Sequence, residues 1–525
     1  MSAVVTDQFR IFNAGNFVDS VLDTNNSYYV FLGLTNPSNP VPGFGRTTTT
    51  SWPLAPNDNF QYESQYRSTA SFGKKINSTN IRRIVRKVQW TNNTSYDMYR
   101  HDYSIDNPAP NSATSRLYDA NYYVVNSDFN VYICIDNGSS GVEGSSTYKG
   151  NASKDEPTST DLEPTVAGSG TDGYIWKFLF SISPSDIIKF DSTEYIVVPN
   201  DWATSTNSQI QNVREAADSE VNFNQIKKVY IANKGDDYKI SEVATCNILG
   251  DGSGAKVLVT TDASGKIDST TVTAGGSGYT YGIVDLGNIQ SQDQNGGFAK
   301  LIPIIPPSRG HGYDIYQELG ADKVLVYARF DDSTKDFPTD AKFAQVGIIK
   351  NPSTYSSKNV VYTGSEYSSL GAIKLTPSDD LRDKVSIGST ITQSNTDGTS
   401  KGYLASYDQV TGVIKYYQDR SLYFGNDVDE TDYANVTTQS KVVPFTGDAS
   451  IAFASGGPSD ASVENFSGST VTIGNQEINL GVEFTSGVAN PEINKTTGDV
   501  IYIDNRKLVT RDSRQKEDIK IILEF

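Results

Sequence analysis

Short apolar runs, each bounded by residues that favour turns, punctuate this sequence. They occupy residues 28–32, 131–135, 173–180, 195–199, 324–330 and 346–352. Runs of about four to eight residues that are rich in β-branched and aromatic side chains predict strands. Residues 36–40, which favour a turn, follow the first run. The last eight residues, 518–525, form a further strand-like run. We therefore expect many short strands, with the last residues of the chain paired in a sheet.

Two segments predict short helices. After Ser78 and Thr79, apolar residues recur with the i, i+3, i+4, i+7 spacing of one helix face, at Ile81, Ile84, Val85 and Val88. The other face would carry Arg82, Arg83, Arg86 and Lys87. Such a basic face is usually solvated, and the alternative is a patch for an acidic partner. The Ser-Pro-Ser-Asp turn at 183–186 could open the second helix.

An internal repeat marks residues 220–305. Tyr279 lies 41 positions after Tyr238, and Gly276 lies 41 positions after Gly235. Residues 255–258 recur as 299–302, so the second copy has gained three residues. Two copies of a strand-turn-strand unit predict a small β insertion, because a solenoid needs about three or more. Gly-rich residues 250–254 precede a strand pattern, which favours a hairpin turn over a phosphate-binding loop.

Two further segments are rich in Ser, Thr, Gly and Asp. Residues 137–170 predict a long surface loop. Residues 376–487 alternate short apolar stretches with polar ones and predict a second all-β insertion. Within it, carboxylates at 426–432 could suggest calcium, but the Gly and terminal Glu of an EF-hand loop are missing at the required offsets. An acidic loop is the favoured interpretation.

Composition and charge narrow the classes of function that this chain could have. The 525 residues suit about three or four domains. With 44 Lys and Arg against 62 Asp and Glu, the net charge of −18 argues against a nucleic-acid binder. No apolar stretch has the length of a membrane-spanning helix, and Asp7 and Arg10 interrupt any apolar signal core. We therefore expect no membrane insertion and production in a cytoplasm-like compartment.

Cysteine and histidine are scarce. Cys134 and Cys246 are the only cysteines, and His101 and His311 are the only histidines. A disulfide framework, a zinc site or a triad with a histidine base therefore lacks its usual residues. We expect Cys134 to be a core residue and His311, between two glycines, to be a turn residue without an apparent partner. No catalytic, cofactor-binding or metal-binding residue is assigned.

Four segments together resemble one family of proteins. They are Phe9 and Arg10, residues 172–180, residues 194–199 and residues 498–525, supported by 96–103 and 131–136. In this order the chain resembles the baseplate wedge subunit, gene product eight, of T-even-like contractile-tailed bacteriophages. The similarity covers both ends and the first 200 residues, and is weaker over 306–375. The insertions at 220–305 and 376–487 have no counterpart in the shorter members.

The resemblance implies a mainly β protein with a layered β-sandwich core and short helices in its loops. The core would comprise residues 1–219, 306–375 and 488–525, interrupted by the two insertions. The resemblance also implies a homodimer that contacts other wedge proteins in the virion tail baseplate, takes part in its rearrangement at contraction and carries no catalytic residue. Assembly in the host cytoplasm, without cofactors, follows from the same resemblance.

An alternative class is a phage tail protein that binds carbohydrate or degrades polysaccharide. Plentiful Asp and Glu leave open a pair of carboxylates at glycosidase separation. The sequence lacks the long β-solenoid repeat expected of a depolymerase. A milder form of this alternative keeps the scaffold role and lets aromatic residues of the insertions contact glycans.

Overall fold

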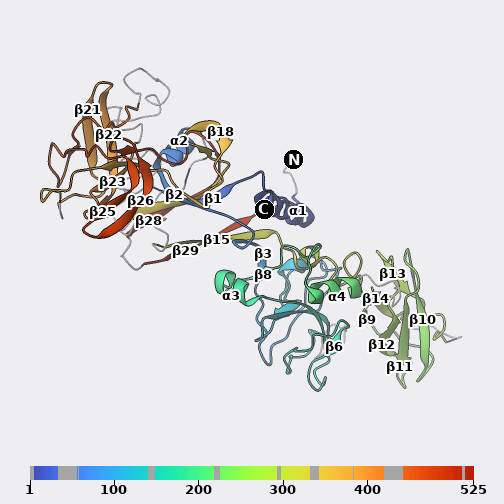
Figure 1. Ribbon diagram of the computed structural model, residues 1–525. Helices are drawn as coiled ribbons and strands as arrows, with labels where there is room; N and C mark the ends of the chain where they lie inside the picture. Colours follow the sequence, from blue (N-terminus) through green and yellow to red (C-terminus); the bar gives the residue numbers. More distant parts are fainter. Residues whose placement is uncertain are drawn as a thin grey trace. The chain divides into compact units, whose positions relative to one another are not determined.

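The computed structural model describes residues 5–33, 56, 58, 60–139, 148–217, 225–291, 297–331, 342–381, 384–418, 442–510 and 515–525. The protein is mainly β, with 42% strand and 11% helix, and its sheets are antiparallel, which confirms the expected fold class (Figure 1). The chain divides into unit 1, of residues 1–18, 82–325 and 522–525, and unit 2, of residues 19–81 and 326–521. The predicted turn at 36–40 and acidic loop at 426–432 lie outside the described residues.

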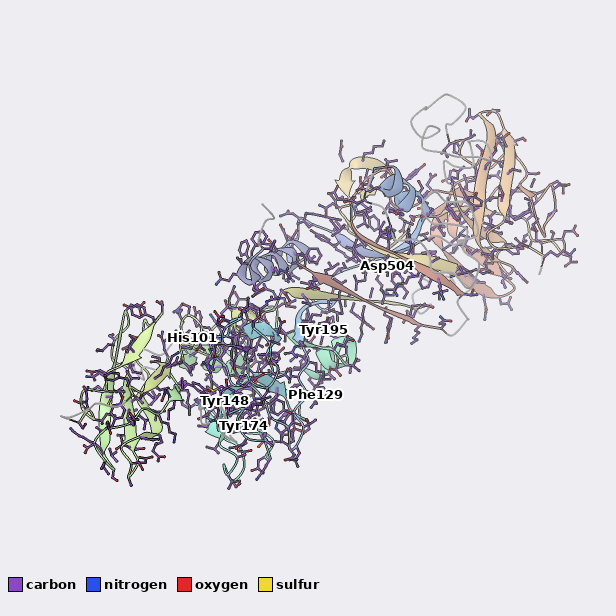
Figure 2. The ribbon with its side chains drawn as sticks, turned by 180° about the vertical axis from the view of Figure 1, so that it is seen from behind. His101, Phe129, Tyr148, Tyr174, Tyr195 and Asp504 are labelled. Carbon is purple, nitrogen blue, oxygen red and sulfur yellow. The ribbon has the colours of Figure 1, made fainter. Side chains whose placement is uncertain are left out.

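The main sheet of unit 1 has the order β4-β5-β7-β6. Its strands are β4 (Tyr123–Val125), β5 (Asn130–Asn137), β6 (Thr165–Val166) and β7 (Tyr174–Ser181). Tyr132 of β5 pairs with Phe178 of β7, and nearly every residue of both strands is buried, as uninterrupted apolar runs predict. Cys134 is buried among them, which confirms it as a core residue. The ring of Tyr174, labelled in Figure 2, stacks on Trp176.

A second sheet overturns the helix predicted after Thr79. It has the order β29-β15-β3-β8, formed by β3 (Ile81–Arg86), β8 (Tyr195–Val198), β15 (Lys323–Phe330) and β29 (Glu517–Glu524). Residues 81–86 are therefore a strand, and the predicted helix is wrong. The strands expected at 195–199 and 324–330, and a strand paired near the end of the chain, are confirmed.

Burial on both faces of β3 explains the error. Ile84 and Val85 are adjacent and point to opposite faces, and both are buried. The arginines are not a solvated helix face either. The Arg82 guanidinium lies 2.9 Å from Asp186, and Arg83 is buried with its guanidinium 3.8 Å from the ring centre of Tyr316.

Helices connect the strands of unit 1. The predicted helix after Ser183 is confirmed as α3 (Pro184–Phe190), and the Ser183 hydroxyl accepts a hydrogen bond from Asp186 N at its first turn. Helices α4 (Ser208–Ala217) and α5 (Ile315–Leu319) and the 3-10 helix η1 (Leu117–Asp119) were not predicted. Helix α1 (Asp7–Leu22), the longest, was also missed.

Residues 225–305, here the repeat module, form a small β structure with its own core. Its strands are β9 (Val229–Asn233), β10 (Val243–Gly250), β11 (Lys256–Thr261), β12 (Ile267–Ala274), β13 (Gly282–Val284) and β14 (Lys300–Pro303), coloured green in Figure 1. They form one sheet of order β12-β11-β10-β13 and a β9-β14 pair. Residues 250–254 connect β10 to its antiparallel neighbour β11, which confirms the hairpin turn.

The two copies of the repeat contact each other reciprocally. The Tyr238 hydroxyl accepts a hydrogen bond from Ala299 N at 2.9 Å, and the Tyr279 hydroxyl accepts one from Ala255 N at 3.3 Å. Gly235 and Gly276 have φ of 61° and 62°. A Cβ on Gly235 would lie 2.6 Å from Ala299 N, and a Cβ on Gly276 would lie 2.6 Å from Ala255 N. Each copy therefore needs the tyrosine and glycine of the other, so one copy cannot complete this fold alone.

This reciprocity predicts a loss at both tyrosines. Tyr238→Phe and Tyr279→Phe each remove the hydroxyl that accepts from an amide of the other copy, so each variant should lose about 1–2 kcal/mol of module stability. The loss should be larger at Tyr279, because its hydroxyl also donates to Ile248 O at 2.9 Å. Hydrogen exchange at the amides of Ala299 and Ala255 would measure the loss. Tyr281→Phe, at an exposed ring, is the matched control and should change neither amide. A loss confined to one tyrosine would show that the copies are not equivalent.

Unit 2 holds two larger sheets. The first has the order β19-β2-β1-β16-β28, from β1 (Tyr28–Gly33), β2 (Ala70–Lys75), β16 (Lys342–Lys350), β19 (Glu366–Ser368) and β28 (Asp499–Thr510), and confirms the strands expected at 28–32 and within 346–352. The second has the order β24-β21-β22-β23-β20-β27, from β20 (Gly371–Lys374), β21 (Thr390–Asn395), β22 (Gly398–Asp408), β23 (Val413–Tyr417), β24 (Ala452–Phe453) and β27 (Val488–Ala489). Helix α2 (Phe60–Thr69) and the hairpins β17–β18 (Ser353–Thr354, Ser357–Val361) and β25–β26 (Gly468–Ile473, Gln476–Phe484) complete it.

Candidate functional site: a charged cleft and exposed apolar surfaces

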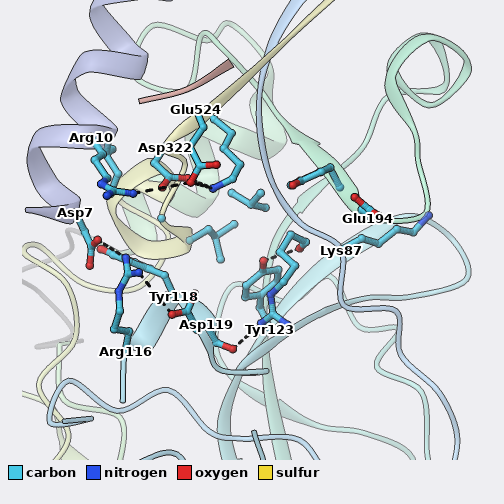
Figure 3. Close-up of a pocket in the computed structure, with 17 residues that line it drawn as sticks. Asp7, Arg10, Lys87, Arg116, Tyr118, Asp119, Tyr123, Glu194, Asp322 and Glu524 are labelled. Atoms are coloured by element: carbon cyan, nitrogen blue, oxygen red, sulfur yellow. Dashed lines mark hydrogen bonds and ion pairs between the residues drawn. The ribbon is translucent and has the colours of Figure 1, made fainter. Parts of the chain in front are cut away.

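A cleft of about 420 Å³ in unit 1 gathers charged side chains from segments far apart in the sequence (Figure 3). Five basic residues line it: Arg10, Arg86, Lys87, Arg116 and Lys323. Five acidic residues line it as well: Asp7, Asp119, Glu194, Asp322 and Glu524. The cleft is therefore balanced in charge and gives a simple anion or cation no net attraction.

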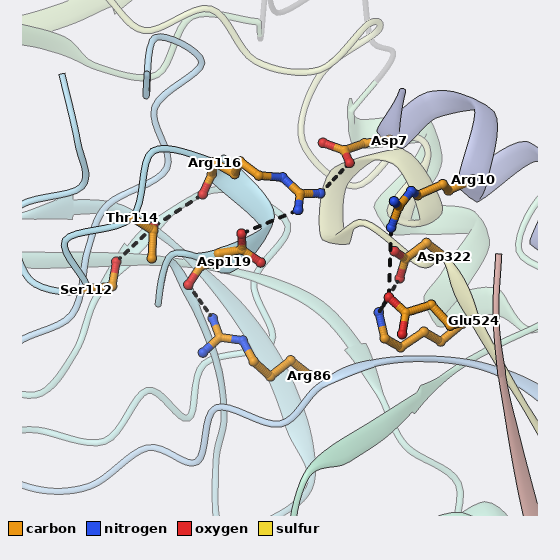
Figure 4. A network of polar contacts seen from close by, with 10 residues as sticks. Asp7, Arg10, Arg86, Ser112, Thr114, Arg116, Asp119, Asp322 and Glu524 are labelled. Carbon is orange, nitrogen blue, oxygen red and sulfur yellow. Dashed lines mark hydrogen bonds and ion pairs between the residues drawn. The ribbon is translucent and has the colours of Figure 1, made fainter. Parts of the chain in front are cut away.

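At one end of the cleft, ion pairs join α1 to the rest of unit 1 (Figure 4). Arg116 contacts Asp7 of α1 and lies 3.7 Å from Asp119. Asp7 belongs to the first turn of α1, where a negative charge also favours the helix dipole. Arg10, one turn further along α1, lies 3.8 Å from Glu524.

The same end of the cleft holds the last residues of the chain. The Lys323 ammonium lies 3.0 Å from Asp322 and 3.2 Å from Glu524. The Phe525 backbone N–H donates to the carbonyl oxygen of Asp322 at 3.2 Å, and the Phe525 ring centre lies 5.5 Å from that of Phe17 in α1. Together with the pairs on Arg10 and Arg116, these contacts fasten α1 and the end of β29 to one another.

At the other end, the basic groups meet fixed polar partners. Arg86 donates to Asn121 Oδ1 at 2.8 Å and to the carbonyl oxygens of Asp119 and Ala120 at 3.1 and 2.8 Å. The Lys87 ammonium lies 2.8 Å from Asp191. These residues are the basic side chains that the sequence pattern had placed on a solvated helix face. They instead hold the loops beside β3.

The pKa shifts in the cleft follow from this pairing. Burial alone would lower the pKa of Lys323, but its hydrogen bond to Asp322 and the charge of Glu524 more than compensate and raise it. Burial, followed by the charge of Asp7, raises the pKa of the Tyr118 hydroxyl to about 12. Lys323 is thus kept protonated beside the carboxylates of Asp322 and Glu524. The charged groups of the cleft therefore pair with other residues of the same chain and stabilise the fold.

Removing one of these pairs should have a small effect. The Arg116 side chain is half exposed, so Arg116→Ala should lower the free energy of unfolding by less than about 1 kcal/mol. Salt should shrink the difference, because exposed ion pairs are screened. Urea unfolding at low and high salt would test this, with Arg506→Ala, at another exposed pair, as the matched control. A loss that salt leaves unchanged would contradict a surface ion pair.

The cysteines and histidines of unit 1 lie away from the cleft lining. Cys134 and Cys246 are both buried and free. His101, labelled in Figure 2, accepts a hydrogen bond at Nδ1 from Ile305 N at 3.1 Å. His311 is in a turn as expected, but it does have a partner: it is buried, and its Nδ1 lies 2.6 Å from Glu318 Oε1. Within the described ranges, no three His, Cys, Asp or Glu side chains are placed to hold a metal.

The exposed large apolar side chains of unit 1 include two groups. On and before α1 they are Val5, Phe9 and Phe12. In the repeat module they are Ile240, Val243, Leu249, Tyr281, Ile283 and Phe298. Exposed apolar side chains that adjoin one another, as Leu249 and Ile283 do across β10 and β13, mark contact surfaces more often than isolated ones do. The sequence pattern did not reveal them, because exposure depends on which neighbours the fold supplies.

Comparison with known proteins leaves the family open. No known family matches the chain, and no curated protein is similar to it in sequence. No helix in the described part of the chain is long and apolar enough to cross a bilayer. The structure shows the mainly β fold. The resemblance to the wedge family and the division into core and insertions stay predictions.

Proposed function

We propose that this chain is a structural subunit of a phage tail baseplate wedge. It acts through contacts with a second copy of itself and with other wedge proteins, and takes part in the rearrangement of the baseplate at tail contraction. The ordered resemblance of residues 172–180, 194–199 and 498–525 supports this proposal. The mainly β fold is compatible with it.

The observation that carries the proposal is the second apolar face of α1. Ile11, Ala14 and Val18 form the buried face of the helix. Phe9 and Phe12 lie on the opposite face and are 54% and 63% exposed. A helix that is apolar on both sides is normally covered on both sides. The exposed phenylalanines therefore suit a contact that a partner protein completes.

The net charge of −18 fits the same role. A strongly acidic chain resists nonspecific self-association before assembly. Complementary basic surfaces on neighbouring subunits would then guide specific docking. Interfaces with two packed arrangements would let the subunit move at contraction without any chemistry of its own.

Co-expression with the other wedge proteins, followed by sizing of the complex, tests the proposal. The unaltered chain should elute in a complex, and the double variant Phe9→Ser/Phe12→Ser should join it at least ten-fold less tightly, as expected for aromatic anchors. Ile105→Ser, at a side chain that is also exposed, is the matched control and should assemble normally.

Two results would contradict the proposal. One is an unaltered chain that remains alone in the presence of every wedge protein. The other is degradation of bacterial surface polysaccharide by the purified chain, which would favour the carbohydrate-active class.

A further inference from the structure

One face of the repeat module presents an ordered apolar cluster to solvent. Along β10, Cys246 and Ile248 point into the core, so Leu249 points outward. Leu249 pairs directly with Ile283 of β13. Tyr281 lies two residues before Ile283, at the bend that leads into β13. Leu249, Ile283 and Tyr281 are 56%, 67% and 59% exposed, and we call them the outer cluster.

The backbone beneath the outer cluster is fixed. Asp251 accepts hydrogen bonds from Thr280 N at 2.9 Å, from the Thr280 hydroxyl at 2.5 Å and from Tyr281 N at 3.3 Å. These hydrogen bonds lower the pKa of Asp251 to about 2, and the bond from the Thr280 hydroxyl has the largest effect. The turn that carries Tyr281 is thus held in place, so a partner need not order it on binding.

Carboxylates stand at both ends of the outer cluster. Asp251 is bonded to the Tyr281 end. Asp285 follows Ile283 by two residues, so it projects from the same face, and its backbone N–H donates to Asn247 O of β10 at 2.9 Å. The basic residue Lys256 does not adjoin Asp285. It pairs with Asn247 from the other side, on β11, so strand β10 lies between Lys256 and Asp285. An apolar centre with a polar edge is the usual form of a protein contact surface, and here the polar edge is acidic.

We propose that the outer cluster is a docking site for a different protein, whose surface offers a large apolar side chain flanked by Arg or Lys. Charge selects this occupant: two copies of the face would oppose Asp251 and Asp285 to carboxylates like themselves, which disfavours self-pairing. The inference rests on the proposed function in one respect, that the partner belongs to the same assembly.

Photo-crosslinking in assembled particles tests the docking site. The full-length chain would carry p-benzoylphenylalanine at position 283, or at position 188 as the matched exposed control. Position 283 should crosslink to a peptide of another wedge protein that contains Arg or Lys. A crosslink to a second copy of this chain, or none, would overturn the inference. Glycan binding that protects Tyr281, without a protein crosslink, would overturn it in favour of glycan contact.

Two substitutions add a quantitative test on the full chain. Ile283→Ser and Asp285→Lys should each weaken binding of the crosslinked partner about ten-fold. Unchanged hydrogen exchange at Ala255 and Ala299 would show that the module stays folded. If the chain joins the wedge but both variants bind normally, this inference fails and the proposed function stands. If the unaltered chain joins nothing, both fail.

Discussion

Glu318→Ala should lower the free energy of unfolding of unit 1 by about 2–4 kcal/mol, because two buried hydrogen-bonding groups lose their acceptor. Glu318 is buried, and its Oε2 accepts a hydrogen bond from Gly312 N at 2.7 Å. Its Oε1 lies 2.6 Å from Nδ1 of His311, which is also buried. Removing the carboxylate leaves an amide and an imidazole nitrogen in the interior without this acceptor.

Glu318→Gln is the matched control for this prediction. The amide oxygen of Gln can still accept from Gly312 N, and its amide nitrogen can face His311, so the loss should stay near 1 kcal/mol. Urea unfolding followed by circular dichroism would measure both variants, and hydrogen exchange at Gly312 would locate the effect. Equal losses in the Ala and Gln variants would show that side-chain volume, and not the polar pair, stabilises this turn.

The His311 pair illustrates what the sequence could not reveal. Glu318 follows His311 by seven residues, but no regular element contains both, because His311 lies in the turn before α5 and Glu318 lies within α5. Gly310 and Gly312, both with φ of 94°, turn the chain before α5 begins at Ile315. Only this turn places Glu318 against His311. A glycine-flanked histidine could therefore be predicted as a turn residue, but its partner could not.

Strands were predictable where several apolar residues follow one another directly. Residues 173–180 and 324–330 are of this kind, although each run holds one basic residue, Lys177 or Arg329, and they form β7 and β15. Prediction failed at β3, because the adjacent Arg82 and Arg83 separate its apolar residues, and the buried Arg83 is accommodated by stacking on Tyr316. With an arginine hidden inside a strand, the remaining apolar residues imitate the spacing of a helix.

Helix α1 and the charged cleft escaped prediction for a related reason. In α1 the buried Ile11, Ala14, Val18 and Val21 follow helical spacing, but Phe9 and Phe12 on the other face obscure this stripe in the sequence. The cleft is lined by residues as distant in sequence as Asp7 and Glu524. Neither residue is unusual in its own segment. Only the three-dimensional fold brings Asp7 to Arg116, and Glu524 to Arg10 and Lys323.

Lys177→Met should raise the free energy of unfolding near neutral pH by about 1–3 kcal/mol. Burial in β7, and next the charge of Lys227, lowers the pKa of Lys177 from 10.5 to about 8, although Glu163 and Glu318 act in the opposite direction. At pH 7 the folded protein therefore keeps a charged ammonium where a neutral group is favoured. Methionine removes that cost but loses the hydrogen bond to Leu162 O, which offsets about 1 kcal/mol.

The pH dependence gives this prediction its sign. Because the pKa is lower in the folded state, the unfolded chain binds more protons between pH 8 and 10.5, and stability contributed by Lys177 rises with pH across that window. The advantage of Lys177→Met should therefore be full at pH 7 and shrink by pH 9.5. Urea unfolding at both pH values would measure it, with the exposed Lys154→Met as the matched control. A destabilised Met variant, or an advantage that grows with pH, would mean that the ammonium of Lys177 stabilises the fold.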